Sequence, residues 1–172
     1  MKLFLCAAPL LMALGAPSAM RESSLRMNYT DSVPIGLYNS QQTPGAPYAG
    51  LCLNQETVAS ALRAGLELGR GECTDGHQPI LKPLYAAMRE APIHLDAEGF
   101  WLGGHRLLNT TPKAYSKTGQ PLAHYPFGSY TSGLWAISNY NRDSFDSRYF
   151  GPVSTDAIRF YARPVLVYRK GN

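Results

Sequence analysis

The apolar residues of this 172-residue chain fall mainly into short runs separated by turn residues, a pattern that favours strands over long helices. The runs lie at residues 80–88, 93–95, 100–102, 106–108, 134–138 and 158–168. Turn-like segments at residues 96–99 and at Gly103-Gly104 predict that several of these strands form a meander. We therefore predict a mainly β fold in a single domain, since this length can bury a hydrophobic core but is too short for two domains.

One segment has helical rather than strand periodicity. Residues 55–68 place Val58, Ala61, Leu62 and Leu66 on a shared face, and Asn54 can cap the first turn. Cys52 and Cys73 flank this helix, and they are an even pair once Cys6 of the N-terminal segment is set aside. The pair is either a disulfide that staples both ends of the helix or two free buried cysteines.

The N-terminus is typical of an export segment. Residues 3–20 carry no charge, the densest apolar part covers residues 3–14, and small residues follow at 16–18. We expect residues 1–19 to be a cleaved signal peptide or a retained N-terminal membrane anchor. The rest of the chain, residues 20–172, is then one domain in an oxidising compartment, where a disulfide would persist.

Composition and spacing argue against several function classes. The net charge is +4, but Lys and Arg are scattered rather than gathered in a stripe, so we expect no nucleic-acid partner. The four histidines and the cysteines show no metal-ligand spacing, so we expect no metal and no other cofactor. The chain also lacks the G-x-S-x-G signature of Ser-His-Asp hydrolases.

Ser32 and Lys82 are the candidates for nucleophilic chemistry. Ser32 precedes Val33-Pro34, which favours extended backbone and a hydroxyl at a strand entrance, although a serine there is also an ordinary turn residue. Lys82 lies inside the apolar segment PILKPLYAAM. It is either a buried amine that loses its proton and acts as a base, or an exposed lysine on an edge strand.

The segment NRDSFDSRYFGPV at residues 141–153 concentrates charged and hydroxyl side chains in a polar, turn-prone region. Asp146 and Arg148 can pair with each other or with their neighbours and stiffen the turn, and the Ser144 hydroxyl can orient a nearby amine. A purely structural turn held by ion pairs is compatible with the same pattern.

Taken together and in this order, SVPIGLY, the segment from Lys82 to the GGHRLL run and DSRYFGPV resemble the signal peptidase I superfamily of Ser-Lys peptidases. Within it they are most similar to the conjugal-transfer pilin peptidases of the TraF type, which the cysteine-flanked helix also resembles. The resemblance implies signal-peptidase-like twisted antiparallel β-sheets with a small helical insertion. It implies Ser32 as nucleophile, Lys82 as general base and Asp146 as an ordering member of the catalytic set, with Ser144 and Arg148 supporting them.

The resemblance also implies a function. The protein would be a membrane-associated serine endopeptidase that processes, and in some members cyclises, an exported pilin precursor for conjugative transfer or type IV secretion. It would act in the periplasm at the outer face of the inner membrane, with the precursor, the membrane surface and other conjugation or secretion components as partners.

Two other hypotheses remain at this stage. A non-catalytic periplasmic assembly factor of the same apparatus could keep the fold with an inactive site. A self-cleaving regulator shares Ser-Lys chemistry, but the export segment and the lack of a DNA-binding half argue against it.

Overall fold

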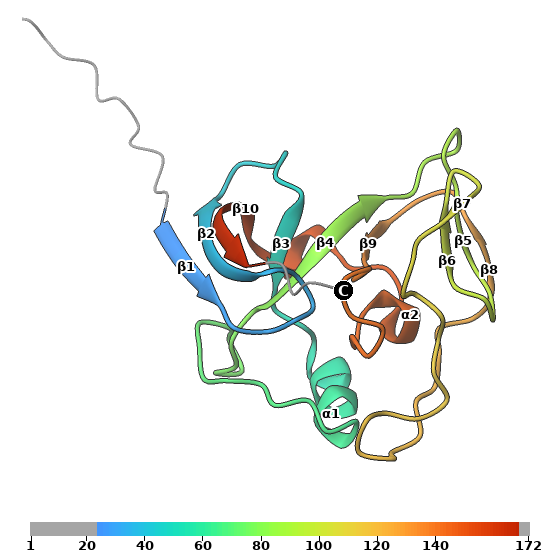
Figure 1. Cartoon of the computed structure of the whole chain (residues 1–172), viewed down its shortest axis with the longest axis horizontal. Helices are drawn as coiled ribbons and strands as arrows, with labels where there is room; N and C mark the ends of the chain where they lie inside the picture. Colours follow the sequence, from blue (N-terminus) through green and yellow to red (C-terminus); the bar gives the residue numbers. More distant parts are fainter. Residues whose placement is uncertain (1–23, 169–172) are drawn as a thin grey trace, which may run out of the picture.

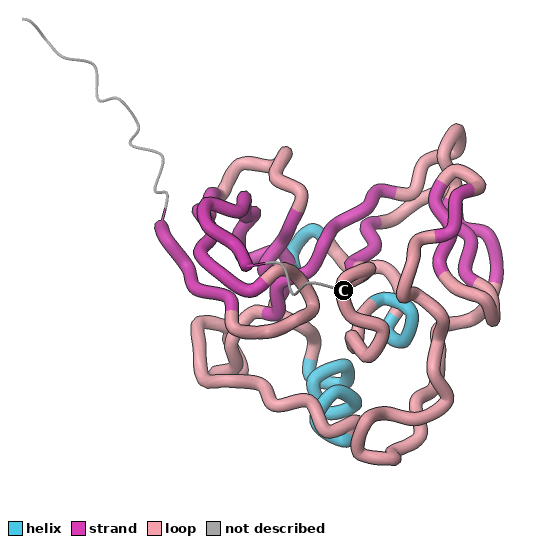
Figure 2. The backbone as a smooth tube through the Cα atoms, in the orientation of Figure 1, coloured by secondary structure: helices cyan, strands magenta, loops and turns pink. Residues whose placement is uncertain are grey.

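The computed structural model describes residues 24–168, which form two antiparallel sheets with short helices beside them (Figure 1). The strands are β1 (Ser24–Asn28), β2 (Ile35–Gln41), β3 (Tyr48–Leu51), β4 (Ile80–Ala86), β5 (Ile93–Leu95), β6 (Phe100–Leu102), β7 (His105–Arg106), β8 (Gly128–Tyr130), β9 (Leu134–Ala136) and β10 (Ile158–Tyr168). The helices are α1 (Gln55–Arg63) and α2 (Ser147–Phe150), with a 3₁₀ turn, η1, at Thr155–Ala157. The prediction of a mainly β fold is confirmed, and strands and loops dominate the backbone in Figure 2.

The larger sheet has the strand order β1-β2-β10-β3-β4-β9, and the smaller sheet has the order β7-β6-β5-β8. Strand β4 pairs with β3 up to Pro83 and with β9 from Leu84 onward, and in Figure 1 it runs from the larger sheet towards the smaller one. Pro83 lacks an N–H for the ladder and lies where the partner strand changes, the kind of position at which a strand tolerates proline. Lys82 immediately precedes this changeover, opposite Ala49 of β3.

The two sheets pack around separate clusters of buried apolar side chains. In the larger sheet, Val33 and Tyr38 pack with Tyr48, Phe160 and Ala162. A second cluster contains residues from β5, β6 and the β9 region, namely Ile93, Leu95, Phe100, Trp135 and Ile137. Val33 is fully buried, so the chain directly after Ser32 is anchored in the core.

Several predicted strands have the expected positions. Strands β5, β6 and β10 have the predicted bounds, whereas β4 and β9 end two residues earlier than predicted. Strand β7 begins one residue earlier and ends two residues earlier than predicted. The prediction does not include β1, β3 or β8. Their sequences, SLRMN, YAGL and GSY, are short and lack β-branched residues, and pairing with neighbouring strands is what makes them extended.

Helix α1 is shorter than predicted. Asn54 caps it, accepting a bond from the Thr57 N–H at 2.8 Å, but the helix ends at Arg63 rather than at residue 68. Gly65 has φ +80°, and the Gly65 and Leu66 amides bond back to Leu62 and Ala61, which closes the helix with a Schellman motif. The Leu62 side chain, predicted on the buried face, is exposed.

The polar, turn-prone segment at residues 141–153 contains the single-turn helix α2. Asp146 caps this helix by accepting a bond from the Arg148 N–H at 3.2 Å. The segment therefore has a fixed backbone at the positions that the sequence marks as charged.

Candidate active site

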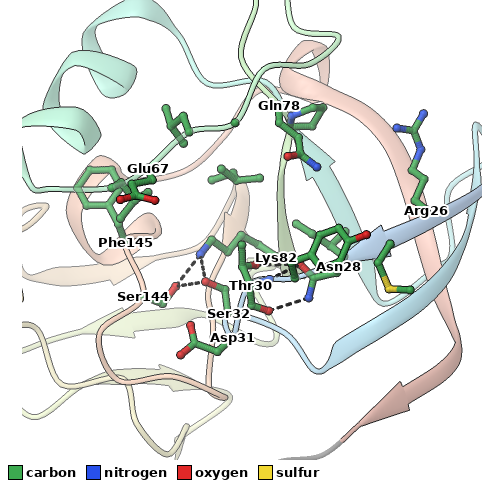
Figure 3. Close-up of a pocket in the computed structure, with 18 of the residues that line it drawn as sticks. Arg26, Asn28, Thr30, Asp31, Ser32, Glu67, Gln78, Lys82, Ser144 and Phe145 are labelled. Atoms are coloured by element: carbon green, nitrogen blue, oxygen red, sulfur yellow. Dashed lines mark hydrogen bonds between the residues drawn. The ribbon is translucent and has the colours of Figure 1, made fainter.

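Ser32, Lys82 and Ser144 meet although they come from three distant parts of the chain (Figure 3). Lys82 Nζ donates to Ser32 Oγ at 2.6 Å and to Ser144 Oγ at 2.7 Å. The two hydroxyl oxygens are 3.3 Å apart. The amine is therefore held between two hydroxyls, in the arrangement that a nucleophile and its base require.

Asn28 shapes the turn that presents Ser32. Its side-chain amide donates to the carbonyls of Thr30, Val33 and Pro34, and its carbonyl oxygen accepts from the N–H and hydroxyl of Thr30. Asn28 is buried at the end of β1, so these bonds close the turn between β1 and β2. The sequence analysis does not identify Asn28, although Asn side chains commonly form turns by bonding the backbone two residues further on.

Lys82 is not an exposed lysine on an edge strand. It is 3% exposed. Strand β3 pairs with β4 at Lys82, β9 pairs with β4 from Leu84 onward, and β4 therefore lies inside the sheet order. Burial lowers the pKa of Lys82 from 10.5 to about 8, because a charged amine loses its hydration there. The charge of Asp146 raises this pKa, that of Arg148 lowers it and that of Asp31 raises it, but burial prevails. With this pKa the amine is neutral in roughly a tenth of the molecules at pH 7, and in about half of them at pH 8.

Asp146 and Arg148 form the ion pair that the sequence predicts, and both side chains are completely buried. Arg148 binds the carboxylate through two nitrogens, with Nε to Oδ1 at 2.8 Å and Nη2 to Oδ2 at 2.9 Å. Arg148 Nη2 also donates to the Ser144 carbonyl at 2.8 Å. Within residues 24–168, the Asp146 carboxylate forms no hydrogen bond to Ser32 or Lys82, so its influence on them is electrostatic and structural.

A cavity of about 300 Å³ opens beside Ser32 and Lys82. Its polar lining includes the labelled residues Ser32, Lys82, Ser144 and Glu67 of Figure 3. Apolar side chains from four segments complete it, namely Leu66, Leu68, Ile80, Phe145 and Phe160. This volume is in the range of small-ligand pockets, and it can hold a few residues of an extended peptide.

Cys52 and Cys73 form a disulfide with a Cα–Cα distance of 5.4 Å, so the alternative of two free cysteines is wrong for this structure. The bridge closes a loop that contains α1 together with Leu66 and Leu68 of the cavity wall. The helical insertion therefore contributes directly to the candidate site.

The predictions for residues 1–19 lie outside the residues that the structure describes. Between residues 24 and 168, no helix is long and apolar enough to cross a membrane. The same residues hold no group of three or more His, Cys, Asp or Glu side chains arranged for a metal ion.

The chain is similar over nearly its full length to conjugation proteins. It is 34% identical over 167 residues to the plasmid transfer protein TraF of Escherichia coli, covering 94% of this chain and 90% of that protein. A second plasmid transfer protein TraF of Escherichia coli is 32% identical, with 83% of each chain covered. The conjugal transfer protein TraF of Agrobacterium fabrum is 25% identical over 83% of this chain and 82% of its own. No protein-family model and no solved structure matches the chain.

Proposed function

The chain belongs to the TraF family of plasmid transfer proteins, and from this premise we propose that it is a Ser-Lys endopeptidase that processes an exported pilin precursor for conjugation. Kinship with the signal peptidase I superfamily is part of the proposal. The observation that carries it is the 2.6 Å contact between Ser32 Oγ and a buried Lys82 amine whose pKa is about 8. The cavity beside that pair supplies room for a peptide.

In the acylation step, Ser32 Oγ attacks the carbonyl carbon of the scissile peptide bond and its proton passes to neutral Lys82 Nζ. The Ser32 N–H stabilises the oxyanion, since no hydrogen bond among residues 24–168 engages it. When the C–N bond breaks, the Lys82 ammonium returns the proton to the leaving amine. Ser144 keeps the amine aimed at the nucleophile throughout.

The ester on Ser32 is released by a second nucleophile, either water or the N-terminal amine of the precursor. Lys82 removes a proton from that nucleophile, and Ser32 regains its hydroxyl as the ester bond breaks. Water yields a trimmed linear pilin, whereas the amine yields a cyclic one that is lighter by one water molecule.

We further propose that the protein works in the periplasm at the outer face of the inner membrane. The uncharged N-terminal stretch over residues 3–20 supports export. The Cys52–Cys73 disulfide supports an oxidising compartment. Other components of the conjugation apparatus are partners in this proposal, as the names of the related proteins suggest.

The test is the intact mass of the pilin precursor of the same conjugation system, co-expressed with wild type, Ser32→Ala or Lys82→Met. Ser132→Ala, at an exposed serine outside the cavity, is the matched control. We expect the wild type and the control to trim the precursor and both site variants to leave it whole. Equal trimming by Ser32→Ala would reject the peptidase and favour a non-catalytic assembly role.

A further inference from the structure

Ser138, which the sequence analysis does not identify, lies beneath Ser32 and contacts it directly. It follows β9 by two positions, and its side chain is completely buried. Its hydroxyl donates to the Ser32 carbonyl oxygen at 2.5 Å, across a separation of 106 residues. Its N–H donates to Asp146 Oδ2 at 3.1 Å. One residue thus connects the buried ion pair to the main chain of the nucleophile.

The direction of the Ser138 hydroxyl is fixed by its other contacts. A serine hydroxyl has one proton to donate and lone pairs that accept. The N–H groups of Tyr140 and Asn141 point at Ser138 Oγ from 3.3 and 3.4 Å, so they occupy its accepting side. The single proton is therefore committed to the Ser32 carbonyl.

Holding this carbonyl restricts the backbone rotation that sets where Ser32 points. The Ser32 carbonyl belongs to the peptide unit shared with Val33, which is itself completely buried. With one end of the unit in the core and its oxygen bound to Ser138, the nucleophile cannot rotate away from Lys82 without breaking buried contacts. A buried polar group that loses its partner costs about 1–3 kcal/mol, which opposes such a rotation.

We propose that Ser138 is a positioning residue through which the Asp146–Arg148 pair holds Ser32 in its reactive orientation. The inference rests on the proposed peptidase function. The same ion pair reaches the base by a second route, because Arg148 Nη2 binds the Ser144 carbonyl and the Ser144 hydroxyl binds Lys82. Asp146 therefore orders the nucleophile and Arg148 orders the base, although neither contacts them by a hydrogen bond.

The test compares Ser138→Ala and Ser138→Cys with Ser40→Ala in steady-state cleavage of the same pilin precursor by purified protein. Ser40 is a matched control because its hydroxyl is also buried and bonded, but to Ser24 and Arg26. We expect Ser138→Ala to lower kcat by between about 10-fold and 100-fold, the scale of a misplaced reacting group. KM should stay unchanged, because Ser138 does not line the cavity. Ser138→Cys keeps a weak donor and should fall between wild type and alanine.

Thermal unfolding of each variant separates positioning from folding. Support requires that Ser138→Ala lose kcat while its Tm stays within the range of Ser40→Ala. A wild-type kcat in Ser138→Ala, or a loss of kcat that follows the loss of Tm across all three variants, would overturn the inference while leaving the peptidase intact. If Ser32→Ala cleaves the precursor as well as wild type, the proposed function itself fails.

Discussion

Lys82 Nζ has two hydroxyl oxygens as its hydrogen-bond partners, Ser32 Oγ at 2.6 Å and Ser144 Oγ at 2.7 Å, and no carboxylate accepts from it among residues 24–168. A carboxylate in contact would hold the amine in its charged form. Hydroxyls can donate to the neutral amine or accept from the charged one, so they serve both protonation states. The site is therefore suited to a lysine that cycles between the two.

The first prediction concerns the identity of the base. Lys82→Arg keeps a positive charge but removes a base, because arginine retains its proton at all working pH values. We expect a loss of at least about 100-fold in precursor cleavage, the usual contribution of a general base. Lys113→Arg, at a lysine that does not line the cavity, is the control and should keep wild-type activity. Cleavage by Lys82→Arg at the wild-type rate would exclude Lys82 as the residue that accepts the proton.

The second prediction is the pH dependence of cleavage. In the proposed mechanism the reactive form of Lys82 is the neutral amine, and the pKa of Lys82 is about 8. The value of kcat/KM should rise by about tenfold per pH unit below that pKa and level off above it. Cleavage of the precursor by the purified protein, measured between pH 6 and pH 10, gives the profile. A flat profile across this interval would contradict the assignment of Lys82 as base.

The pH profile of the Asp31→Asn variant provides a further test of Lys82 as the base. The Asp31 carboxylate raises the pKa of Lys82, and asparagine keeps the shape that binds the Asn141 amide. Removing the charge should move the inflection of the profile to lower pH without abolishing cleavage. An inflection that moves upward would mean that a different group titrates.

The third prediction concerns stability. The folded pKa of Lys82, about 8, lies below its ordinary value of 10.5, so between these values the unfolded chain binds a proton that the folded chain does not. Folding stability therefore rises with pH in this interval, and the penalty of the buried charge is complete only below it. Lys82→Met should be more stable than wild type at pH 7, and its advantage should shrink by roughly 2 kcal/mol by pH 10. Urea unfolding at both pH values measures the difference.

Sequence periodicity predicts best those strands whose own residue types favour an extended backbone. Strand β10 is rich in aromatic and β-branched residues, and its predicted bounds are confirmed. Strand β1 is different, because its SLRMN sequence, exposed at Ser24, Leu25 and Met27, is extended through its pairing with β2. Gly65 ends α1, a stop signal that the apolar spacing of Leu62 and Leu66 obscures.

The residues of the candidate site also fall into those that the sequence identifies and those that only the structure identifies. Lys82 stands out as a charged side chain in an apolar run, whereas Ser32 and Asp146 are ordinary residues of polar, turn-prone segments and are marked by the resemblance of those segments to Ser-Lys peptidases. Ser138 carries no such mark, because its role depends on a contact with a residue 106 positions away. Sequence alone also cannot say whether Lys82 is buried, since its side chain is covered by segments far away in the chain, among them those of Ser32 and Ser144.

The fourth prediction concerns the buried ion pair. Asp146→Asn leaves the Arg148 guanidinium with a buried charge and no counter-ion, which should lower the free energy of unfolding by about 3–5 kcal/mol. The double variant Asp146→Asn/Arg148→Met removes both charges and should be more stable than either single variant. Urea unfolding of the four proteins completes the cycle. Strict additivity of the two single losses would show that the pair is not coupled.

The fifth prediction concerns the disulfide. Cys52 and Cys73 are 21 positions apart, and closing a loop of that length restricts the unfolded chain. Replacing both cysteines by serine should therefore lower the free energy of unfolding by about 3 kcal/mol. The same loop supplies Leu66 and Leu68 to the cavity wall, whereas Ser32 and Lys82 lie outside it. Loss of the bridge should consequently raise KM for the precursor more than it lowers kcat.

Reduction of the wild type with dithiothreitol provides an independent route to the same state. It should reproduce both effects in the wild type and change nothing in the Cys52→Ser/Cys73→Ser variant. A fall in kcat at constant KM would mean that the bridge supports the Ser-Lys pair rather than the wall. Lys82 follows Cys73 by only nine positions. Comparing the effects on KM and kcat therefore tests whether opening the disulfide disturbs only the cavity wall or also β4, which carries Lys82.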